Sequence, residues 1–201
     1  GDNPFKKKEV RQALYQAIDI EAIKKKVMRG LSEPAGIITF PGVNGYTKEL
    51  DKRLPYDVDA AKKLLADAGY PKGFDVELRC PNDRYVNDEA ICTAVVGMLG
   101  KIGVNVNLFA QTKSKHFKEL KEDKGDFYML GWGVPTLDSH YVFHYLYESG
   151  ASWNKVNFSN SEVDAAIRVM EGEVDLDKRN AAIANAWKIV KDDISYLPLH
   201  H

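Results

Sequence analysis

The sequence has few cysteines, no long apolar run and no excess of charge, and each absence argues against a class of protein. Its 201 residues include two cysteines and carry a formal net charge of −1. A near-neutral charge gives no electrostatic reason to expect nucleic acid or an anionic membrane surface as a partner. No apolar run approaches the roughly 18–20 residues that a membrane-spanning helix needs. We therefore expect no nucleic-acid partner and no membrane span in this segment.

The signature motifs of several enzyme classes are also missing. The chain has no GxSxG nucleophile elbow, no Walker A loop and no GxGxxG after a predicted strand. His140 and His144 have the spacing of an HExxH motif, but the residues between them include no glutamate to act as the general base. We therefore assign no catalytic residue and no cofactor, and we expect that the protein is not an enzyme.

The two cysteines leave two interpretations open. Cys80 and Cys92 form no CxxC and have no Cys/His ladder around them, which argues against a zinc knuckle. They are either two small buried apolar side chains or a disulfide across a short loop, which would contribute about 2–3 kcal/mol. An exported protein would permit the disulfide.

Helical and strand patterns alternate along the chain, most clearly in residues 56–109. Segments 74–80, 104–109 and 127–132 read as strands, and the first two alternate apolar and polar residues. Segments with helical periodicity lie before the first strand and between the strands, and Gly69 and Gly103 are expected to end two of these helices. The candidate helix N-caps are Asp19, Asp57 or Asp59, Thr112 or Ser114, Asp138 or Ser139, Ser161, and Asp175 or Asp177. Because no segment reads as a linker, we expect one α/β domain whose three strands form a small mixed sheet.

Several blocks of the sequence carry a resemblance to a known family. They are "NPFKKKEVRQALYQAID" at the start, "YDVDAAKKLLADAGYPKGF" and "GDFYMLGWGVPTLDSHYVF" in the middle, and "NFSNSEVDAAI" and "ISYLPLHH" near the end. In these blocks, and in their order, the chain resembles the family 5 extracellular solute-binding proteins of ABC importers, the dipeptide, oligopeptide and nickel group. The resemblance covers nearly the whole chain.

This resemblance implies a fold and a domain organisation. The fold would be a single lobe of the periplasmic-binding-protein-like type II fold, peptide class, with a small mixed sheet flanked by helices. Family members enclose their ligand between two lobes by hinge closure, and this chain matches the C-terminal lobe. We therefore expect residues 1–201 to be a C-terminal lobe without its N-terminal lobe. The chain begins with Gly1 and shows no signal peptide, as expected of an excised segment.

The resemblance also implies a function. The lobe would help to capture a peptide or another small solute for import, with the missing N-terminal lobe and an ABC permease as partners. Its location would be periplasmic, or extracellular and membrane-anchored. Two other classes stay open: a metal-dependent enzyme or metal-binding domain that uses His140 and His144, and a purely structural or interaction domain. The sequence does not identify the solute.

Arg84 is the first candidate ligand-binding residue. It lies just after the strand 74–80 and before a long helix, and such strand ends are the usual ligand positions of open α/β sheets. In dipeptide-binding members an Arg in a similarly placed loop holds the peptide carboxylate, which a guanidinium can bind through two hydrogen bonds. The alternative is a solvated surface arginine.

The other candidates follow the third strand. Trp132 either lines the ligand cleft or belongs to the core, and we favour the cleft because aromatic residues are frequent in pockets. In peptide-binding members an Asp three residues later pairs with the free α-amine, but here that position is Pro135. Asp138 is the nearest carboxylate, and it either takes the amine role or caps the next helix, which is the interpretation that cap statistics favour. Trp153 and Asn154 are expected at the same opening.

His140, His144 and Glu148 follow one another at helical i, i+4 spacing. That spacing can place three metal ligands on one helical face. Such pairs of histidines also arise in ordinary amphipathic helices with partly exposed imidazoles, and we favour that interpretation. No metal ligand is therefore assigned from the sequence.

Overall fold

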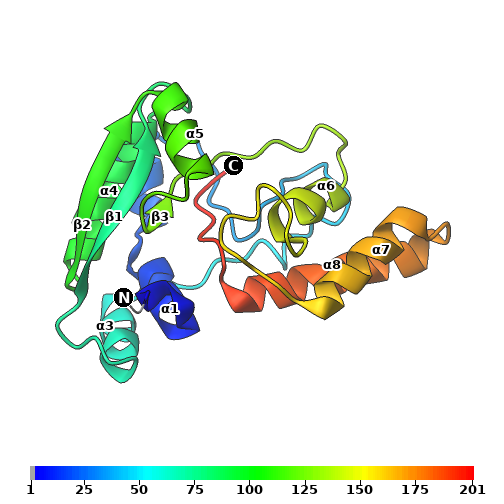
Figure 1. The fold of residues 1–201 in the computed structure, drawn as a ribbon, viewed down its shortest axis with the longest axis horizontal. Helices are drawn as coiled ribbons and strands as arrows, with labels where there is room; N and C mark the ends of the chain where they lie inside the picture. Colours follow the sequence, from blue (N-terminus) through cyan, green and yellow to red (C-terminus); the bar gives the residue numbers. More distant parts are fainter. Residues whose placement is uncertain (1–2) are drawn as a thin grey trace. The chain divides into compact units, whose positions relative to one another are not determined.

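The computed structural model describes residues 3–201, and they form two compact units (Figure 1). The unit called here the sheet unit runs to Pro34 and continues over Leu54–Gly131. The helical unit combines Ala35–Arg53 with Trp132–His201. Each unit thus uses two separate stretches of chain, so no single linker divides them. None of the helices within residues 3–201 is both long and apolar enough to cross a membrane.

The sheet has three strands, β1 Phe74–Pro81, β2 Val104–Gln111 and β3 Phe127–Tyr128, in the order β2-β1-β3. This confirms that the three predicted strands lie together. The expectation of a mixed sheet is wrong, because β1 pairs parallel with both neighbours. The helices α4 Asp88–Gly100 and α5 Lys113–Lys121 connect consecutive strands and return the chain to the same end of the sheet, which makes neighbouring strands parallel.

The third strand is shorter than the predicted range 127–132. It pairs with β1 only through Phe127 and Tyr128. The next carbonyl, that of Met129, lies 3.0 Å from Nε2 of the buried His116 on α5. Met129 N still donates to Arg79 O of β1 at 2.9 Å, and β3 ends where the carbonyl of the same residue faces a side chain instead of a strand.

The two faces of the sheet differ in what covers them. Val76 and Leu78 are buried on the side of α4, as their alternation predicts. On the other side of the strand Arg79 is only 8% exposed, although it is charged. Its guanidinium lies 3.9 Å from the ring centre of Phe109 and forms ion pairs with Glu77 and with Glu119 of α5. Aromatic stacking and paired charge thus make its burial tolerable.

A disulfide joins the sheet to its covering helix. Cys80 of β1 and Cys92 of α4 are bonded, with 6.6 Å between their Cα atoms and a sequence separation of 12. The Sδ atom of Met129 lies within 3.9 Å of both sulfurs. The disulfide is therefore the correct one of the two interpretations that the sequence left open.

Two glycines permit a close approach of backbone at the start of β1 and β2. Gly73 has φ of +75° and Gly103 has φ of +85°, both in the left-handed region. A Cβ atom on Gly73 would clash with the backbone of Gly103. These positions explain why each strand is preceded by glycine.

The remaining helices of the sheet unit are α1 Lys8–Ala17, α2 Ile20–Ala22 with the π-helical turn Ile23–Val27, and α3 Val58–Asp67, while Pro4–Lys6 forms a 3₁₀ turn. Two of them, α2 and α3, begin at aspartate caps, whereas α1 begins at Lys7 without a side-chain cap. The Asp19 carboxylate accepts a hydrogen bond from Ala22 N, and that of Asp57 from Ala60 N, both at 2.9 Å. Both predicted caps are confirmed.

The helical unit is built around α8 Leu176–Asp193, beside which α7 Ser161–Gly172 lies (Figure 1). Trp187 of α8 is fully buried, 4.5 Å from the ring centre of Phe143, and its Nε1 donates to Ser139 Oγ at 3.0 Å. The short helix α6 His140–Val142 and the π-helical turn Phe143–Tyr147 supply that wall of the core. Asp175 caps α8 as predicted, but Asn160 and not Ser161 caps α7.

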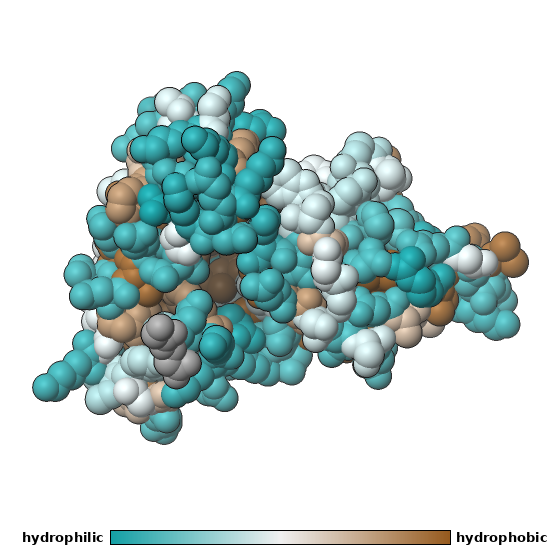
Figure 2. All heavy atoms as spheres, in the orientation of Figure 1, coloured by the Kyte–Doolittle hydropathy of each residue, from teal (hydrophilic) through white to brown (hydrophobic). Residues whose placement is uncertain are grey.

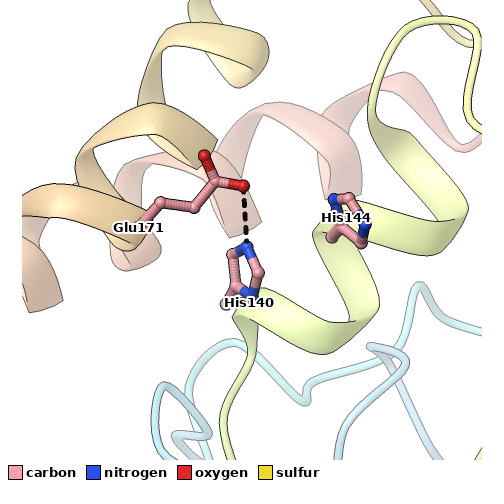
Figure 3. A group of neighbouring side chains, drawn as sticks. All are labelled: His140, His144 and Glu171. Atoms are coloured by element: carbon pink, nitrogen blue, oxygen red, sulfur yellow. Dashed lines mark hydrogen bonds and ion pairs between the residues drawn. The ribbon is translucent and has the colours of Figure 1, made fainter.

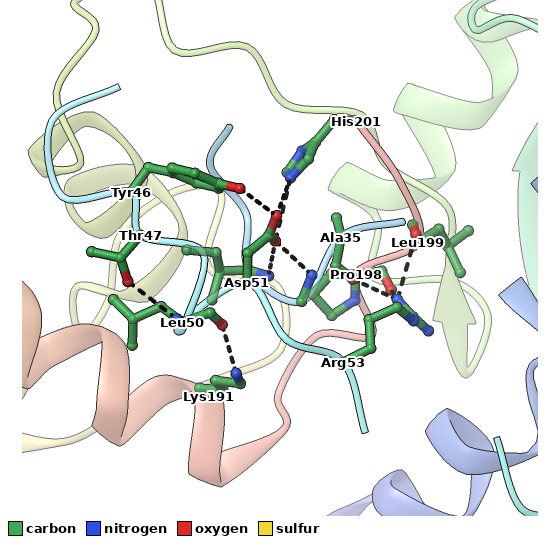
Figure 4. A network of polar contacts seen from close by, with 12 residues as sticks. Ala35, Tyr46, Thr47, Leu50, Asp51, Arg53, Lys191, Pro198, Leu199 and His201 are labelled. Carbon is green, nitrogen blue, oxygen red and sulfur yellow. Dashed lines mark hydrogen bonds and ion pairs between the residues drawn. The ribbon is translucent and has the colours of Figure 1, made fainter. Parts of the chain in front are cut away.

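A polar network holds the segment Ala35–Arg53 to the end of the chain (Figure 4). The Asp51 carboxylate accepts from Gly36 N at 2.8 Å and from Tyr46 Oη at 3.0 Å, and it pairs with His201 at 3.1 Å. Arg53 donates to the carbonyls of Ala35, Pro198 and Leu199. Side chains thus stabilise a segment that has no regular secondary structure.

The surface in Figure 2 is mostly hydrophilic, with an apolar tip at the loop between α7 and α8. Val174 and Leu176 are 91% and 69% exposed there. These two side chains therefore contribute little to the core of the helical unit.

Candidate ligand-binding site

Arg84 lies in a short loop that a buried carboxylate holds in place at the carboxyl end of β1. The Asp88 carboxylate accepts hydrogen bonds from the backbone N–H groups of Arg84 and Tyr85, each at 2.9 Å. The Arg84 side chain itself is exposed and lies 5.0 Å from the ring centre of Tyr85. Its guanidinium has no carboxylate partner within residues 3–201. A fixed backbone with an uncommitted cation is suited to bind an anionic group.

Trp132 belongs to an aromatic cluster in the helical unit. The centre of its ring lies 6.0 Å from Tyr141, 5.9 Å from Tyr145 and 6.0 Å from Trp153. Tyr141 and Tyr145 are themselves 4.8 Å apart. The Nε1 of Trp132 is buried and has no hydrogen-bond partner among the described residues. Trp132 and Trp153 were both predicted as site residues, and the structure brings them together.

Asp138 has partners of its own within the helical unit. Arg179 of α8 binds its two carboxylate oxygens at 2.8 and 2.9 Å. Asn44 donates to the same carboxylate at 3.1 Å, and the backbone N–H of His140 donates at 2.9 Å. The carboxylate therefore holds the start of α6, consistent with the capping interpretation, and it also ties together three separate parts of the chain.

These contacts set the ionisation of Asp138. Burial by itself would raise the pKa of the carboxyl group, but hydrogen bonds from Arg179, His140 N–H and Asn44 outweigh burial and lower the pKa to about 2. The group is therefore a carboxylate at neutral pH. The sequence reveals neither Arg179 nor Asn44 as a partner, because both lie far from Asp138 along the chain.

Asn154 is buried and its side-chain amide is fully used. Its Nδ2 donates to the carbonyls of Glu148 and Phe158 at 2.9 and 2.7 Å, and its Oδ1 accepts from Phe158 N at 3.0 Å. These bonds hold the loop that carries Trp153. Asn154 thus positions a site residue, and a direct contact with ligand stays a prediction.

The predicted site residues fall in both units. Arg84 belongs to the sheet unit, whereas Trp132, Asp138, Trp153 and Asn154 belong to the helical unit. The structure brings Trp132 and Trp153 together, and Asn154 holds the loop of Trp153, whereas Asp138 contacts Arg179, Asn44 and the His140 N–H. That Arg84 faces the same ligand stays a prediction.

The two spaced histidines have a third neighbour that the sequence did not indicate. His140, His144 and Glu171 of α7 each offer one ligand atom, and these atoms lie within 4.8 Å of one another (Figure 3). Glu148, which follows at helical spacing, instead pairs with His144 Nδ1 at 2.7 Å. Only the packing of α7 could reveal Glu171.

Comparison with known proteins supports the resemblance seen in the sequence. Residues 1–154 match the family described as bacterial extracellular solute-binding proteins, family 5 middle. Heme-binding protein A of Haemophilus influenzae is 30% identical over 206 residues, which cover 98% of this chain and 37% of that protein.

Two solved structures share the fold. The dipeptide binding protein from Pseudoalteromonas sp. SM9913 in complex with Met-Leu superposes with a TM-score of 0.86 at 27% identity, covering 100% of this chain and 40% of that one. The periplasmic binding protein DppA from Helicobacter pylori in complex with the peptide STSA gives a TM-score of 0.90 at 22% identity, covering 99% and 39%. At that lower identity the likeness shows the fold alone.

The chain spans about two fifths of the length of these relatives. The match to the family covers most of the chain, and the peptide-binding structures confirm the predicted lobe architecture apart from the strand direction. The chain belongs to the family 5 bacterial extracellular solute-binding proteins.

Proposed function

We propose that this chain is the C-terminal lobe of a solute-binding protein that captures a peptide or a related small solute for an ABC importer. The observation that carries the proposal is the family match over residues 1–154. The complete protein would enclose its ligand between this lobe and an N-terminal lobe, and it would deliver the ligand to a permease. It would work in the periplasm or at the outer cell surface, as a binding protein without turnover.

Arg84 is proposed to bind the carboxylate of the solute. Its backbone is fixed by Asp88, and its guanidinium is exposed and has no internal carboxylate partner. A related dipeptide binding protein was solved with Met-Leu, a ligand that ends in a carboxylate. A charge-assisted hydrogen bond of this kind contributes about 1.5–3 kcal/mol.

The aromatic cluster around Trp132 is proposed to pack against the body of the solute. Its rings offer large apolar faces, and Trp132 Nε1 lacks a partner among the described residues. A buried donor without an acceptor costs about 1–3 kcal/mol, so a ligand oxygen or a water that reaches it would stabilise the site.

Asp138 is proposed to support the loop and not to bind the amine of a peptide. Its oxygens already accept from Arg179, Asn44 and the His140 N–H. With Pro135 in the position of the usual aspartate, no carboxylate remains in this loop for a free ammonium. We therefore expect the solute to be selected mainly at its carboxylate end.

Calorimetric titration of the full-length protein with a peptide and with its C-terminally amidated form tests this proposal. Arg84→Ala should weaken the free peptide about tenfold to a hundredfold and leave the amide unchanged. Lys101→Ala is a matched control, since it removes one positive charge at the opposite end of α4. Equal affinity of the unmodified protein for the two peptides would refute the role of Arg84, and an absence of any solute binding would refute the function.

A further inference from the structure

Two neighbouring helical segments of the helical unit bring together three side chains that offer metal-ligand atoms. His140 and His144 lie on successive turns at α6 and the π-helical turn that follows, with nearly parallel rings whose centres are 5.5 Å apart. Glu171 reaches toward them from α7 (Figure 3). One ligand atom from each residue lies within 4.8 Å of the other two.

The distance between His140 and Glu171 suits a shared metal ion as well as a direct hydrogen bond. His140 Nε2 and Glu171 Oε1 are 3.3 Å apart, at the long end of the N–H···O range. Two ligands bound to tetrahedral zinc at about 2.0–2.1 Å are roughly 3.3–3.4 Å apart. A cation between these two atoms would need little movement of either side chain, and rotation of the His144 side chain would complete the set.

Glu148 can orient the second imidazole for metal binding. Its Oε2 lies 2.7 Å from His144 Nδ1, a close contact whose direction is not that of a hydrogen bond. A rotation of the imidazole would turn this contact into an N–H···O bond from Nδ1 and leave the lone pair on Nε2 for a metal. Metal-ligating histidines commonly donate their other N–H group to a carboxylate in this way.

Arg168 holds both carboxylates in place. It forms ion pairs with Glu148 Oε1 and with Glu171 Oε2. Each carboxylate therefore keeps its other oxygen directed at a histidine. The three candidate ligands are 30–42% exposed, so that an ion from solvent can reach them.

We propose that His140, His144 and Glu171 bind one divalent transition-metal ion of the zinc class. Two imidazoles and a carboxylate are a ligand set that suits zinc, nickel and copper, and a water would complete a tetrahedron. The site uses none of the residues proposed to hold the solute. Binding would join α6 to α7 and stabilise the helical unit, because a ligand of the folded state alone favours folding.

Titration of the 201-residue chain with zinc chloride, followed by calorimetry, tests the site. One ion per chain is expected, together with a rise in melting temperature. Glu171→Gln, His140→Ala and His144→Ala should each weaken zinc binding by roughly tenfold to a hundredfold or more, and Glu148→Gln by roughly tenfold. Cobalt in place of zinc should show the visible absorption of a tetrahedral ion, and this absorption should be lost in His144→Ala.

Two controls separate this site from other sources of binding. Glu173→Gln removes a charge two residues from Glu171, from a side chain that accepts a hydrogen bond from Asp175 N, and it should leave zinc affinity unchanged. A double variant, His200→Ala with His201→Ala, should still bind zinc. Circular dichroism checks that every variant is folded. Unchanged affinity in both histidine variants, or loss of binding in the C-terminal double variant, would overturn the proposal.

Discussion

The sheet unit and the helical unit hold their irregular segments by different means. In the sheet unit the parallel ladder satisfies the backbone, and the disulfide between Cys80 and Cys92 attaches α4 covalently. Residues 35–53 and 132–201 of the helical unit, all described by the structure, include no β-strand, and their loops are held by charged and amide side chains such as Asp138 and Asn154. Reduction of the disulfide should therefore destabilise chiefly the sheet unit, and acid should destabilise chiefly the helical unit.

The largest expected effect is on the aromatic core of the helical unit. Without a sheet, this unit depends on Trp187, which is fully buried against Phe143. Trp187→Ala should lower the free energy of unfolding by about 3–5 kcal/mol. Chemical denaturation followed by circular dichroism measures it, and Trp132→Ala is the matched control, since Trp132 is only half-buried. Similar losses for the two variants would mean that the core is not centred on α8.

Removal of the disulfide should be the largest change within the sheet unit. A cross-link over a separation of 12 residues contributes about 3 kcal/mol in the chain-entropy description. We expect the double variant Cys80→Ser and Cys92→Ser to have a free energy of unfolding lower by that amount. The reduced native protein should have a similar stability. Backbone amide hydrogen exchange should become faster first in β1 and α4. If it became faster first in α8, the disulfide would not act chiefly on the sheet unit.

Asp138 is expected to make the stability of the helical unit sensitive to acid. The folded-state pKa of about 2 lies below the unfolded value of 3.8, so the carboxylate stabilises the fold above the unfolded pKa and loses this effect as pH falls through the folded pKa. Asp138→Asn should cost about 2 kcal/mol at neutral pH.

The difference in unfolding free energy between Asp138→Asn and the unmodified protein should shrink as the pH falls from 4 toward about 2, the folded-state pKa of Asp138. Denaturation curves at a series of pH values measure this. A constant difference across that range would show that Arg179 and Asn44 do not hold the pKa of Asp138 low.

The smallest effect is expected at Arg84. The side chain is exposed, and Asp88 holds the loop through backbone N–H groups that a substitution keeps. Arg84→Ala should change the free energy of unfolding by no more than about 0.5 kcal/mol. A loss comparable to that of Asp138→Asn would make Arg84 a structural residue and not a ligand-binding one.

The sequence determined most of the sheet unit. Alternation in β1, glycines before β1 and β2, and the caps Asp19 and Asp57 are local features, and local features are visible in a sequence. The family resemblance is likewise a property of the sequence, and it gave the lobe architecture and the candidate residues Arg84 and Trp132.

The tertiary structure alone decided which polar side chains are partners. The burial of Arg79, the pairing of Asp138 with Arg179 and the approach of Glu171 to His140 join residues on different elements. The direction of the strands and the choice of a disulfide over two free thiols were decided in the same way. The physical reason is that periodicity records which face of one element is buried, whereas hydrogen bonds and ion pairs between elements depend on how those elements pack.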